Sequence, residues 1–486
     1  MPTHPFDLPS VLEGTGGRLV GALPPMTRFR AVERDARAVR PGDLFIAIQG
    51  ENFDGHAFIA DAAIHGAAAA LVREAWAADQ PVPSVLPLPP LPLVVVPDEP
   101  VAALQRLARW WREQLPLTVV GITGSVGKTS AKEVAAAVLG RRFAVYRNPG
   151  NLNNEIGLPL SLLEATPETE VAVLEMGGAY AFGDLALLAA IAHPVVGVVL
   201  NIHPVHLERM GTIEAIAETK AELVDALPAD GIAVLNGDDP RVRAMAPRSR
   251  GGVLFFGLGV DTYVRATDLV DRGLDGHAFT LRIGDRAWPV ETPMVGAHTP
   301  VVALAGLAVG HALGMSPEEM IPALADRAIQ IRVRFLPGPG GSRLIDDTYN
   351  ASTQSVLSAL GVLAAAGARR SVAVLGDMRE LGAGSEAEHR TVGRRAAAVA
   401  DLVVTFGDEA RVLAEEAARG VDGRRPAVAS FGPDEKDGLV AFLQRELGAG
   451  DVVLLKGSRG LRMETVVAAL TEPSPDAVAA AGSPGA

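Results

Sequence analysis

The residues that most clearly could do chemistry lie at 121–130, in the order Gly-Ile-Thr-Gly-Ser-Val-Gly-Lys-Thr-Ser. They follow the apolar run 117–120 and precede the alanine-rich run 131–139, which predicts a strand, a glycine turn and a helix. Backbone N–H groups and the positive end of the helix dipole converge on such a turn and can hold a phosphate group. Lys128 would then reach the β- and γ-phosphates of a nucleotide, and the Thr129 hydroxyl would hold its Mg²⁺. A glycine turn without a ligand is the alternative, because the usual G-x-x-x-x-G-K-[ST] spacing requires glycine at position 122, where this chain has isoleucine.

Three further residues of the same region are candidates for the site. Glu175 ends the apolar run 171–174, where a carboxylate could coordinate a metal ion; a solvated strand end is the alternative. His206 follows the run 195–200 in a loop with another histidine and a glutamate, which surface polarity would equally explain. Lys220 lies within a predicted helix, and a helical lysine is usually solvated.

An asparagine cluster occupies positions 150–157, with the sequence Gly-Asn-Leu-Asn-Asn-Glu-Ile-Gly. The side chains of Asn151, Asn153 and Asn154 could orient a polar ligand without adding charge. An asparagine-rich turn before the helix expected from Leu158 is the alternative.

Polar segments also follow three predicted strands near the C-terminus, at 346–350, 376–382 and 456–459. Because the carboxyl ends of parallel strands meet at one edge of a sheet, these segments together predict a crevice, whereas each alone would be an ordinary loop. Lys456 and Arg459 could bind a carboxylate or a phosphate there, since arginine favours bidentate contacts with both groups.

The elements that must position these residues divide the chain into three α/β domains, expected at 1–115, 116–328 and 329–472. Strands are predicted at 43–48, 68–72 and 93–96, then at 117–122, 171–176, 195–200 and 232–235, and finally at 343–347, 371–375, 402–406 and 452–455. The central sheet should be mostly parallel, with an antiparallel part at 263–290 and closing helices at 300–313 and 317–328. The proline-rich segment 81–92 is expected to form a surface loop, Trp110 and Trp111 to pack at a domain interface, and the tail 473–486 to be disordered.

Composition excludes several classes of protein. The net charge of −13 argues against a general binder of nucleic acid or anionic membranes. No apolar run is long enough to span a bilayer, and the N-terminus lacks the basic and apolar regions of a signal peptide. The absence of cysteine is compatible with a reducing compartment, so we expect a cytoplasmic protein without membrane insertion.

Taken together, these segments resemble the Mur ligase family of ATP-dependent amide-forming enzymes over nearly the whole chain. The segments 35–37, 41–45 and 54–56 are similar to the family's uridine-nucleotide-binding segment, 123–129 to its shortened phosphate loop, and 151–159 to its substrate and nucleotide segment. The resemblance implies a small uridine-nucleotide-binding domain, a central P-loop ATPase domain and a C-terminal Rossmann-like domain. The family's Gly-x-His-Asn-x-x-Asn appears at 296–302 with Thr299 and Val302 in place of the two asparagines, which contact adenine in the family.

The resemblance also implies roles for single residues. Lys128, Glu175, His206 and Lys220 would be catalytic, and the Mg²⁺ ligands would be Thr129, Glu175, His206 and Lys220, the last as a carbamate. ATP would contact Gly124, Ser125, Gly127, Lys128, Thr129, Ser130, Asn154, His298, Arg334, Asp347 and Asn350. The other substrates would contact Asp35, Arg37, Asp54, His56, Asn151, Asn153, Lys456, Ser458 and Arg459.

Within the family, segment 346–351 resembles the member that adds D-Ala-D-Ala to UDP-MurNAc-tripeptide in peptidoglycan precursor synthesis. The Asp-Asn-Pro-Arg motif usual in the ligase that adds the third amino acid is absent. The resemblance therefore implies an acyl-phosphate mechanism and a monomer with these small-molecule substrates. A ligase for the third amino acid, a folate polyglutamate synthase, and a nucleotide-binding regulator without catalysis are the alternatives.

Overall fold

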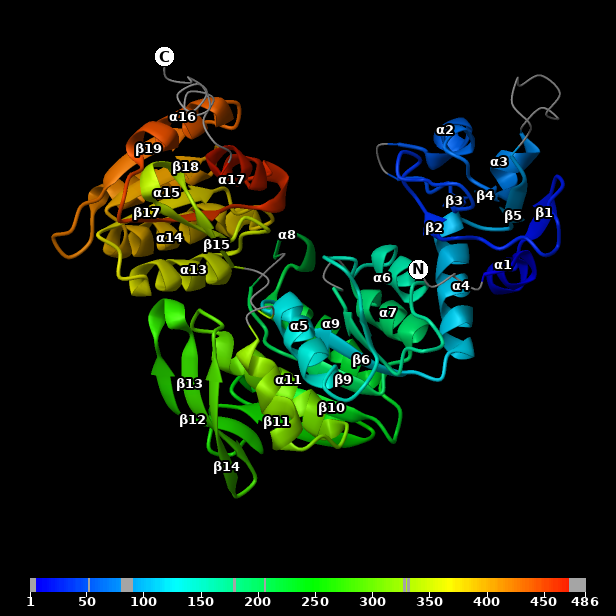
Figure 1. Ribbon diagram of the computed structural model, residues 1–486, viewed down its shortest axis with the longest axis horizontal. Helices are drawn as coiled ribbons and strands as arrows, with labels where there is room; N and C mark the ends of the chain where they lie inside the picture. The colour runs from blue at the N-terminus through cyan, green and yellow to red at the C-terminus, as the bar shows by residue number, and fades with distance from the viewer. Residues whose placement is uncertain are drawn as a thin grey trace, which may run out of the picture.

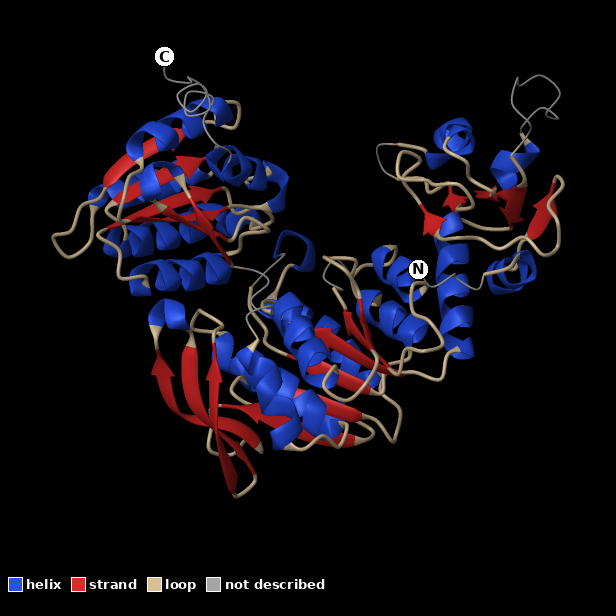
Figure 2. Cartoon of the chain, in the orientation of Figure 1, coloured by secondary structure: helices blue, strands red, loops and turns tan. Residues whose placement is uncertain are grey.

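The computed structural model describes residues 6–50, 53–79, 91–177, 181–204, 207–326, 329 and 333–471. Within these ranges the chain forms three α/β domains, each built on its own sheet, which confirms the predicted fold class (Figures 1 and 2). The first domain (blue) and the third (yellow to red) lie at opposite ends of the central one (Figure 1). Residues 80–90 and the tail 473–486 lie outside the described residues, so the predictions of a surface loop and of disorder stay predictions.

The first domain has a five-stranded sheet in the order β1-β5-β4-β3-β2, in which only β1 pairs antiparallel. The central strands β3, β4 and β5 are apolar and almost fully buried, as expected for parallel strands covered on both faces. The elements are α1 (Leu8–Thr15), β1 (Arg18–Val20), β2 (Val32–Glu33), β3 (Leu44–Ile46), η1 (Gly55–Phe58), α2 (Ile59–Ile64), β4 (Ala69–Arg73), α3 (Glu74–Ala78), β5 (Leu93–Val96) and α4 (Pro100–Gln114).

Helix α4 joins the first domain firmly to the central one. It packs on α6 (Gly157–Leu162) and α7 (Asp184–Ala192), and one hydrophobic cluster runs without a break from Phe6 through α4 to these helices. Trp111 is buried there, donates its indole N–H to the carbonyl oxygen of Ala165 at 2.9 Å, and meets the ring of Phe6 edge-on. The prediction of a tryptophan at a domain interface is confirmed for Trp111.

The central domain has a nine-stranded sheet in the order β14-β13-β12-β11-β10-β9-β6-β8-β7. Pairs from β7 to β12 are parallel, and β12, β13 and β14 form the predicted antiparallel part. Its strands are β6 (Thr118–Thr123), β7 (Val145–Arg147), β8 (Val171–Glu175), β9 (Val196–Val199), β10 (Ile232–Asn236), β11 (Gly252–Gly257), β12 (Val264–Asp271), β13 (His277–Ile283) and β14 (Arg286–Thr292). Its other helices are α5 (Lys128–Leu139), α8 (Leu207–Met210), α9 (Ile213–Asp225), α10 (Pro240–Arg243), α11 (Thr299–Ala312) and α12 (Pro317–Met320), with short η2 (Ala246–Arg248), η3 (Gly273–Asp275) and η4 (Ile321–Ala325).

Helices cover both faces of this sheet because its strands are apolar on both sides. Val120 and Ile122 pack in the same cluster as α5 and α11, whereas Val119 packs in the cluster of α4, α6 and α7. Helices α5 and α11 touch closely where Gly306 lies: a Cβ there would sit 2.6 Å from Val134 Cγ1. This contact holds the phosphate-loop helix against the sheet.

The third domain has a six-stranded sheet in the order β15-β16-β20-β17-β18-β19, parallel except for β15. Helices α13, α14 and α15 cover one face, and α16 and α17 cover the other. The elements are β15 (Arg334–Pro337), η6 (Pro339–Gly341), β16 (Arg343–Asp346), α13 (Thr353–Ala365), β17 (Arg370–Gly376), η7 (Gly382–Gly384), α14 (Ser385–Val399), β18 (Leu402–Phe406), α15 (Ala410–Arg419), β19 (Ala427–Phe431), α16 (Lys436–Glu446), β20 (Asp451–Lys456), η8 (Arg459–Leu461) and α17 (Glu464–Thr471).

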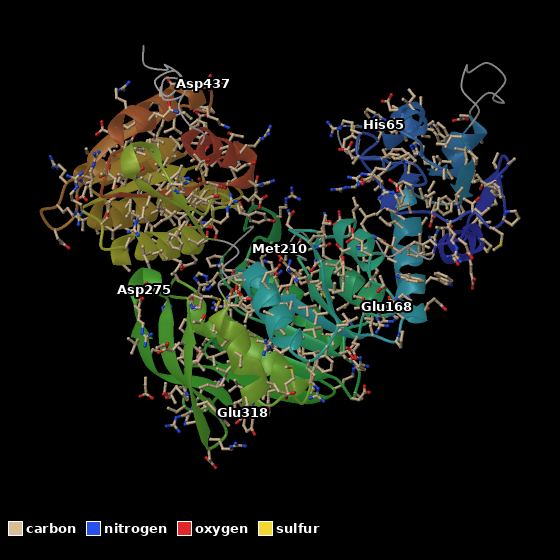
Figure 3. All side chains as sticks on the ribbon, viewed as in Figure 1. His65, Glu168, Met210, Asp275, Glu318 and Asp437 are labelled. Atoms are coloured by element: carbon tan, nitrogen blue, oxygen red, sulfur yellow. The ribbon has the colours of Figure 1, made fainter. Side chains whose placement is uncertain are left out.

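Smaller contacts join the third domain to the central one. Turn η3 of the central domain packs on helix α13 of the third, and helix α8 of the central domain packs on turn η7 of the third. In Figure 3 the labels Asp275 (η3) and Met210 (α8) mark these two contacts. Val295 packs in the core cluster of the third domain, and His298 Nδ1 lies 2.9 Å from the hydroxyl oxygen of Ser358 on α13.

Two expectations about the elements need correction. The helix predicted at 317–328 is α-helical only over Pro317–Met320 and continues as a 3₁₀ turn, because Pro322 has no N–H to donate to the carbonyl of residue 318. Short strands were also missed, among them β15 and β19. Their burial patterns mix exposed and intermediate residues, so they lack the apolar run by which a buried strand is predicted.

We predict that Gly306→Ala destabilises the protein by about 1–3 kcal/mol, because the added methyl group overlaps Val134 in a packed core. Gly361→Ala in α13 is the matched control: no atom lies within 4 Å of its added Cβ, so the helix should gain up to about 1 kcal/mol. Urea unfolding followed by circular dichroism measures both, and equal stability of the two variants would contradict the packing.

Candidate active site

The turn between β6 and α5 has the form of a phosphate loop. Gly124 and Gly127 have φ angles of 151° and 85°, which side chains rarely allow. Lys128 folds back over the turn and donates from Nζ to the carbonyl oxygens of Gly124 at 2.8 Å and Ser125 at 3.3 Å. The start of α5 therefore opens on a cavity that the loop lines, which suits an anionic phosphate.

The segment after β9 braces this loop from below. The Asn201 side chain accepts a hydrogen bond from the Val126 N–H at 2.9 Å and donates to the Val126 carbonyl oxygen at 3.0 Å. The backbone carbonyl oxygen of Asn201 accepts a hydrogen bond from the Ser125 N–H at 3.0 Å. The backbone N–H of His203 donates to the Ser125 hydroxyl oxygen at 2.9 Å. Our sequence analysis gave Asn201 no role, because its partners lie 75 residues away along the chain.

Glu175 is buried at the end of β8 and is directed at the same cavity. Its Oε1 accepts a hydrogen bond from Asn153 Nδ2 at 2.7 Å. Its Oε2 has no hydrogen-bond partner among the described residues, although it is buried. A buried carboxylate oxygen without a partner is unfavourable unless a cation or donor completes it, so this atom fits a metal ion.

A second buried network fixes the backbone that carries Glu175. Asn148 accepts the Glu175 N–H at 2.8 Å and donates to the carbonyl oxygens of Glu175 at 3.0 Å and Leu152 at 2.7 Å. Lys132, one turn after Lys128 on α5, is fully buried and donates to the Asn148 carbonyl oxygen at 2.6 Å. Sequence analysis missed both residues; the one available signal was a lysine on an apolar stretch of α5.

Lys220 is also buried, within α9, and its Nζ donates to the carbonyl oxygen of Gly177 at 2.8 Å. Burial, together with the positive charge of Lys128, lowers the pKa of Lys220 to about 7. The side chain therefore has a substantial neutral fraction near neutral pH, unlike a solvated lysine.

On the third domain, the turn after β16 is held by a buried ion pair. Lys456 Nζ lies 2.6 Å from an Asp347 carboxylate oxygen and donates to the Asn350 carbonyl oxygen at 2.8 Å. Sequence analysis predicted a substrate contact for Lys456, but this side chain is fully buried and lines neither of the two cavities described here. A buried ammonium is stable only with its acid, so Lys456 shapes the turn instead.

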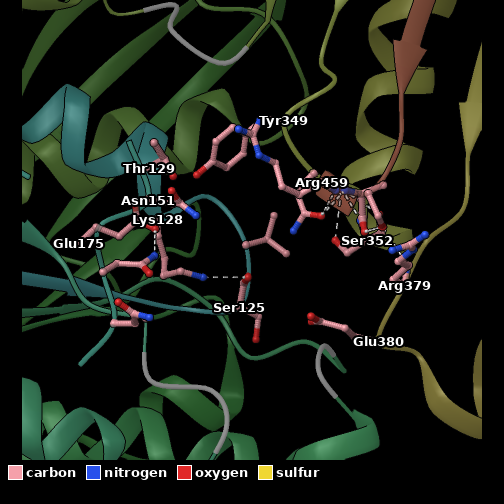
Figure 4. A pocket seen from close by; sticks show the side chains of 18 of the residues that line it. Ser125, Lys128, Thr129, Asn151, Glu175, Tyr349, Ser352, Arg379, Glu380 and Arg459 are labelled. Atoms are coloured by element: carbon pink, nitrogen blue, oxygen red, sulfur yellow. Dashed lines mark hydrogen bonds between the residues drawn. The ribbon is translucent and has the colours of Figure 1, made fainter. Parts of the chain in front are cut away.

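The two domains face each other across a cavity of about 510 Å³ (Figure 4). The central domain contributes Ser125, Lys128, Thr129, Asn151, Asn153, Asn154, Glu175 and Asp184, and the third contributes Tyr349, Asn350, Ser352, Arg379, Glu380, Ser458 and Arg459. The Arg459 guanidinium lies 5.7 Å from the centre of the Tyr349 ring. Cations and anions thus occur on both walls, as a site for charged substrates requires.

A second cavity of about 420 Å³ adjoins the phosphate loop between the same domains. Its lining is mostly apolar and includes Ser130, His298, Asp347 and the buried Thr299 and Val302. The side chain of Val302 packs toward Gly127, at 3.6 Å from the position of a Cβ there. The positions where the family carries asparagine therefore present apolar and hydroxyl groups to this cavity.

The remaining predicted residues lie elsewhere. Asp35 pairs with Arg37 at 2.7 Å and Asp54 with His56 at 2.6 Å, both within the first domain, and the hydrogen bond from Arg37 lowers the pKa of Asp35 to about 2. Arg334 Nη2 lies 2.5 Å from the buried Asp346 carboxylate, and Arg334 lines neither cavity. His206 lies outside the described residues.

Comparison with known proteins matches all three domains. The "Mur ligase family, catalytic domain" matches residues 28–109, the "Mur ligase middle domain" 122–310, and the "Mur ligase, glutamate ligase domain" 331–459. A curated relative from Bacillus subtilis, UDP-N-acetylmuramoyl-tripeptide–D-alanyl-D-alanine ligase, is 33% identical over 95% of this chain and 98% of its own. The chain belongs to the Mur ligase family. It is therefore an ATP-dependent, amide-forming enzyme.

Solved structures agree with this assignment. The MurF of Acinetobacter baumannii aligns with a TM-score of 0.83 at 30% identity, covering 97% of this Mur ligase and 100% of that chain. The MurF ligase of Thermotoga maritima in complex with ADP aligns with a TM-score of 0.74 at 32% identity, covering 91% and 97%. In the part of this Mur ligase that the structure describes, no helix has the length and apolarity needed to cross a membrane.

We predict that Asn201→Ala weakens ADP binding by about 10-fold, because the partly buried backbone of Val126 loses two hydrogen bonds, each worth about 0.5–1.5 kcal/mol. Isothermal titration calorimetry measures the dissociation constant. Gln114→Ala on the exposed face of α4 is the control and should bind ADP normally; an unchanged affinity for Asn201→Ala would show that the loop keeps its shape without this brace.

Proposed function

We propose that this Mur ligase adds D-Ala-D-Ala to UDP-MurNAc-tripeptide, as the names of its relatives describe, in cytoplasmic peptidoglycan precursor synthesis for the cell wall. The observation that carries the proposal is the cavity that joins the phosphate loop on one wall to Ser458 and Arg459 on the other. One wall suits ATP and the carboxylate that it activates, and the other suits a dipeptide with a free carboxylate.

The chemistry begins with activation of the tripeptide carboxylate. A carboxylate oxygen attacks the γ-phosphorus of ATP, the bond to the bridging oxygen breaks, and ADP leaves with the electron pair. Lys128 and the N–H groups of the loop would neutralise charge that builds on the transferred phosphoryl group. The dipeptide amine then attacks the acyl phosphate through a tetrahedral intermediate and expels phosphate.

Mg²⁺ fits the residues on the central wall. Magnesium is commonly held by one or two carboxylates together with substrate phosphates. Glu175 lines the same cavity as Thr129, and its buried Oε2 has no hydrogen-bond partner among the residues that the structure describes. We assign Thr129 and Glu175 to hold it, with His206 and Lys220 as further ligands. When bound, the ion supplies charge neutralisation at the phosphates.

A lysine can bind magnesium only after its amine has become anionic. Lys220 is buried beside this wall with a low pKa, so its neutral amine can add carbon dioxide and lose a proton to give a carbamate. The carbamate oxygens would then complete the magnesium site. The buried surroundings favour a negative group there once the cation is bound.

We assign the residues that bind the other parts of the substrates by the domain on which they lie. Asp35, Arg37, Asp54 and His56 would hold the uridine nucleotide on the first domain, and Asn151 and Asn153 the tripeptide. Arg334, Asp347 and Asn350 would contact ATP from the third domain. Because contacts to ATP come from two domains, closure of the third domain would complete the site of a monomeric enzyme.

The test is phosphate release from ATP and Mg²⁺ with UDP-MurNAc-tripeptide and D-Ala-D-Ala, added singly and together. We expect release coupled to product only with both, and Lys128→Ala should lower it at least about 100-fold because a main stabiliser of the transferred charge is gone. Gln114→Ala should keep full activity. Ligation of other amines in preference to D-Ala-D-Ala, or release by Lys128→Ala at the normal rate, would contradict the proposal.

For the carbamate, we expect a protein-bound carbamate signal in the carbon NMR spectrum after exchange with ¹³C-bicarbonate. Lys220→Ala should lack this signal and should also lack turnover. Lys436→Met serves as the comparison, because it removes a lysine of the third domain whose Nζ donates to the Leu461 carbonyl oxygen, outside the magnesium site. A signal that persists in Lys220→Ala would place the carbamate elsewhere.

A further inference from the structure

The loop after β17 carries a residue that the mechanism above does not use. Glu380 lines the cavity and has a φ of 67°, in the left-handed region that most residues with a side chain avoid. Among the described residues that line this cavity, it is the one non-glycine with such an angle. Strain of this kind persists where the surroundings impose it, and it concentrates at functional sites.

The backbone before Glu380 is fixed by buried contacts. The Asp377 carboxylate accepts the Ala410 N–H at the start of α15 at 2.8 Å. The Met378 N–H donates to Nε2 of the fully buried His389 at 3.0 Å. These contacts anchor the loop to the core of the third domain.

Contacts on either side of Glu380 complete the constraint. The Arg379 N–H donates to the Ser458 hydroxyl oxygen at 2.9 Å. Beyond it, Gly382 lies against the central domain, where an added Cβ would be 3.3 Å from Glu208 Cα. The loop is thus held at a point where the two domains meet, and the direction of the Glu380 side chain is set by its backbone.

Figure 4 shows what that direction is. The Glu380 carboxylate points across the cavity toward Ser125, Arg379 lies on the opposite side, and the Arg459 side chain extends toward the Tyr349 ring. Glu380 thus lines the same cavity as the phosphate loop, where a carboxyl group would be activated, and as Arg379 and Arg459, which suit the carboxylate end of a dipeptide.

The proposed reaction needs a proton acceptor beside the amine of the dipeptide. A dipeptide amine is largely protonated at neutral pH and is not a nucleophile until it loses a proton. The carboxylates Glu155, Glu175 and Asp184 line the cavity from the central domain, whereas Glu380 lines it from the third domain, on the wall that suits the dipeptide. A general base must touch the ammonium itself.

We propose that Glu380 binds the ammonium of the incoming dipeptide and accepts its proton; this inference rests on the proposed function. One proton passes to Glu380, and the amine lone pair forms the C–N bond with the acyl carbon. The second proton passes to the departing phosphate as the C–O bond breaks and its electron pair stays on phosphate. Glu380 then releases its proton to solvent, so atoms and charge balance.

Two variants distinguish the effect of the Glu380 carboxylate from the effect of its backbone conformation. Glu380→Gln keeps the size of the side chain, and Glu380→Gly removes it while adopting the left-handed angle without strain. Each is assayed with ATP, Mg²⁺ and UDP-MurNAc-tripeptide, once with D-Ala-D-Ala and once with hydroxylamine. Hydroxylamine traps the acyl phosphate as a hydroxamate and needs no base, because it is largely unprotonated at neutral pH.

We expect dipeptide ligation to fall about 100-fold or more in both variants, the usual effect of losing a general base, with hydroxamate formation unchanged. Glu380→Gly should melt at the wild-type temperature or above. Glu386→Gln, an exposed residue on α14 paired with Arg390, is the control and should behave as wild type in both assays.

Three results would overturn the proposal. Ligation at the wild-type rate in either variant would show that the carboxylate takes no proton. An equal fall in ligation and in hydroxamate would place Glu380 in activation or domain closure instead. A wild-type enzyme that forms neither product would overturn the proposed function itself, which the first two results leave intact.

Discussion

The fully buried contact between the Lys132 ammonium and the Asn148 carbonyl oxygen, at 2.6 Å, is the interaction on which the rest of the site depends. It connects helix α5, which follows the phosphate loop, to the segment after β7. The Asn148 side chain in turn hydrogen-bonds the backbone N–H and carbonyl oxygen of Glu175. The Lys132 ammonium also lies 3.2 Å from a Glu133 carboxylate oxygen, so this acid and the carbonyl oxygens of the loop together stabilise the buried charge. The phosphate loop and the buried carboxylate therefore keep a fixed separation before any ligand arrives, which is what preorganised charge stabilisation requires.

The same rigidity does not extend over the whole molecule. The first and central domains share one continuous core through α4, whereas the third meets the central domain through a few small contacts such as His298 with Ser358. Domain interfaces with few contacts allow the domains to move relative to each other. The half of the site that holds the phosphate loop is thus fixed, and the half that carries Glu380 and Arg459 belongs to the domain that can move.

The sequence revealed those parts of the site that depend on local order, and little that depends on distant contacts. The strand, turn and helix around Lys128 follow one another, so the phosphate loop could be predicted from spacing. Asn201 could not, because it acts on Val126 across 75 residues. Lys456 was assigned to substrate because it follows a strand, but burial with Asp347 decides its role, and burial is a property of the folded chain. The left-handed backbone of Glu380 leaves no trace in its residue type.

The division of the site between two domains follows from the reaction itself. In the proposed reaction three charged molecules would enter and three products would leave, so the cavity would have to open, yet the acyl phosphate would have to be kept from water until the amine attacks. A single rigid domain could satisfy only one of these demands. In this chain the phosphate wall lies on the rigid pair of domains, and the charged groups of the other wall lie at strand ends of the third domain. Closure would then bring an anionic group on the moving domain toward Lys128 on the fixed one, so opposite charges favour the closed state and solvent exclusion strengthens that attraction.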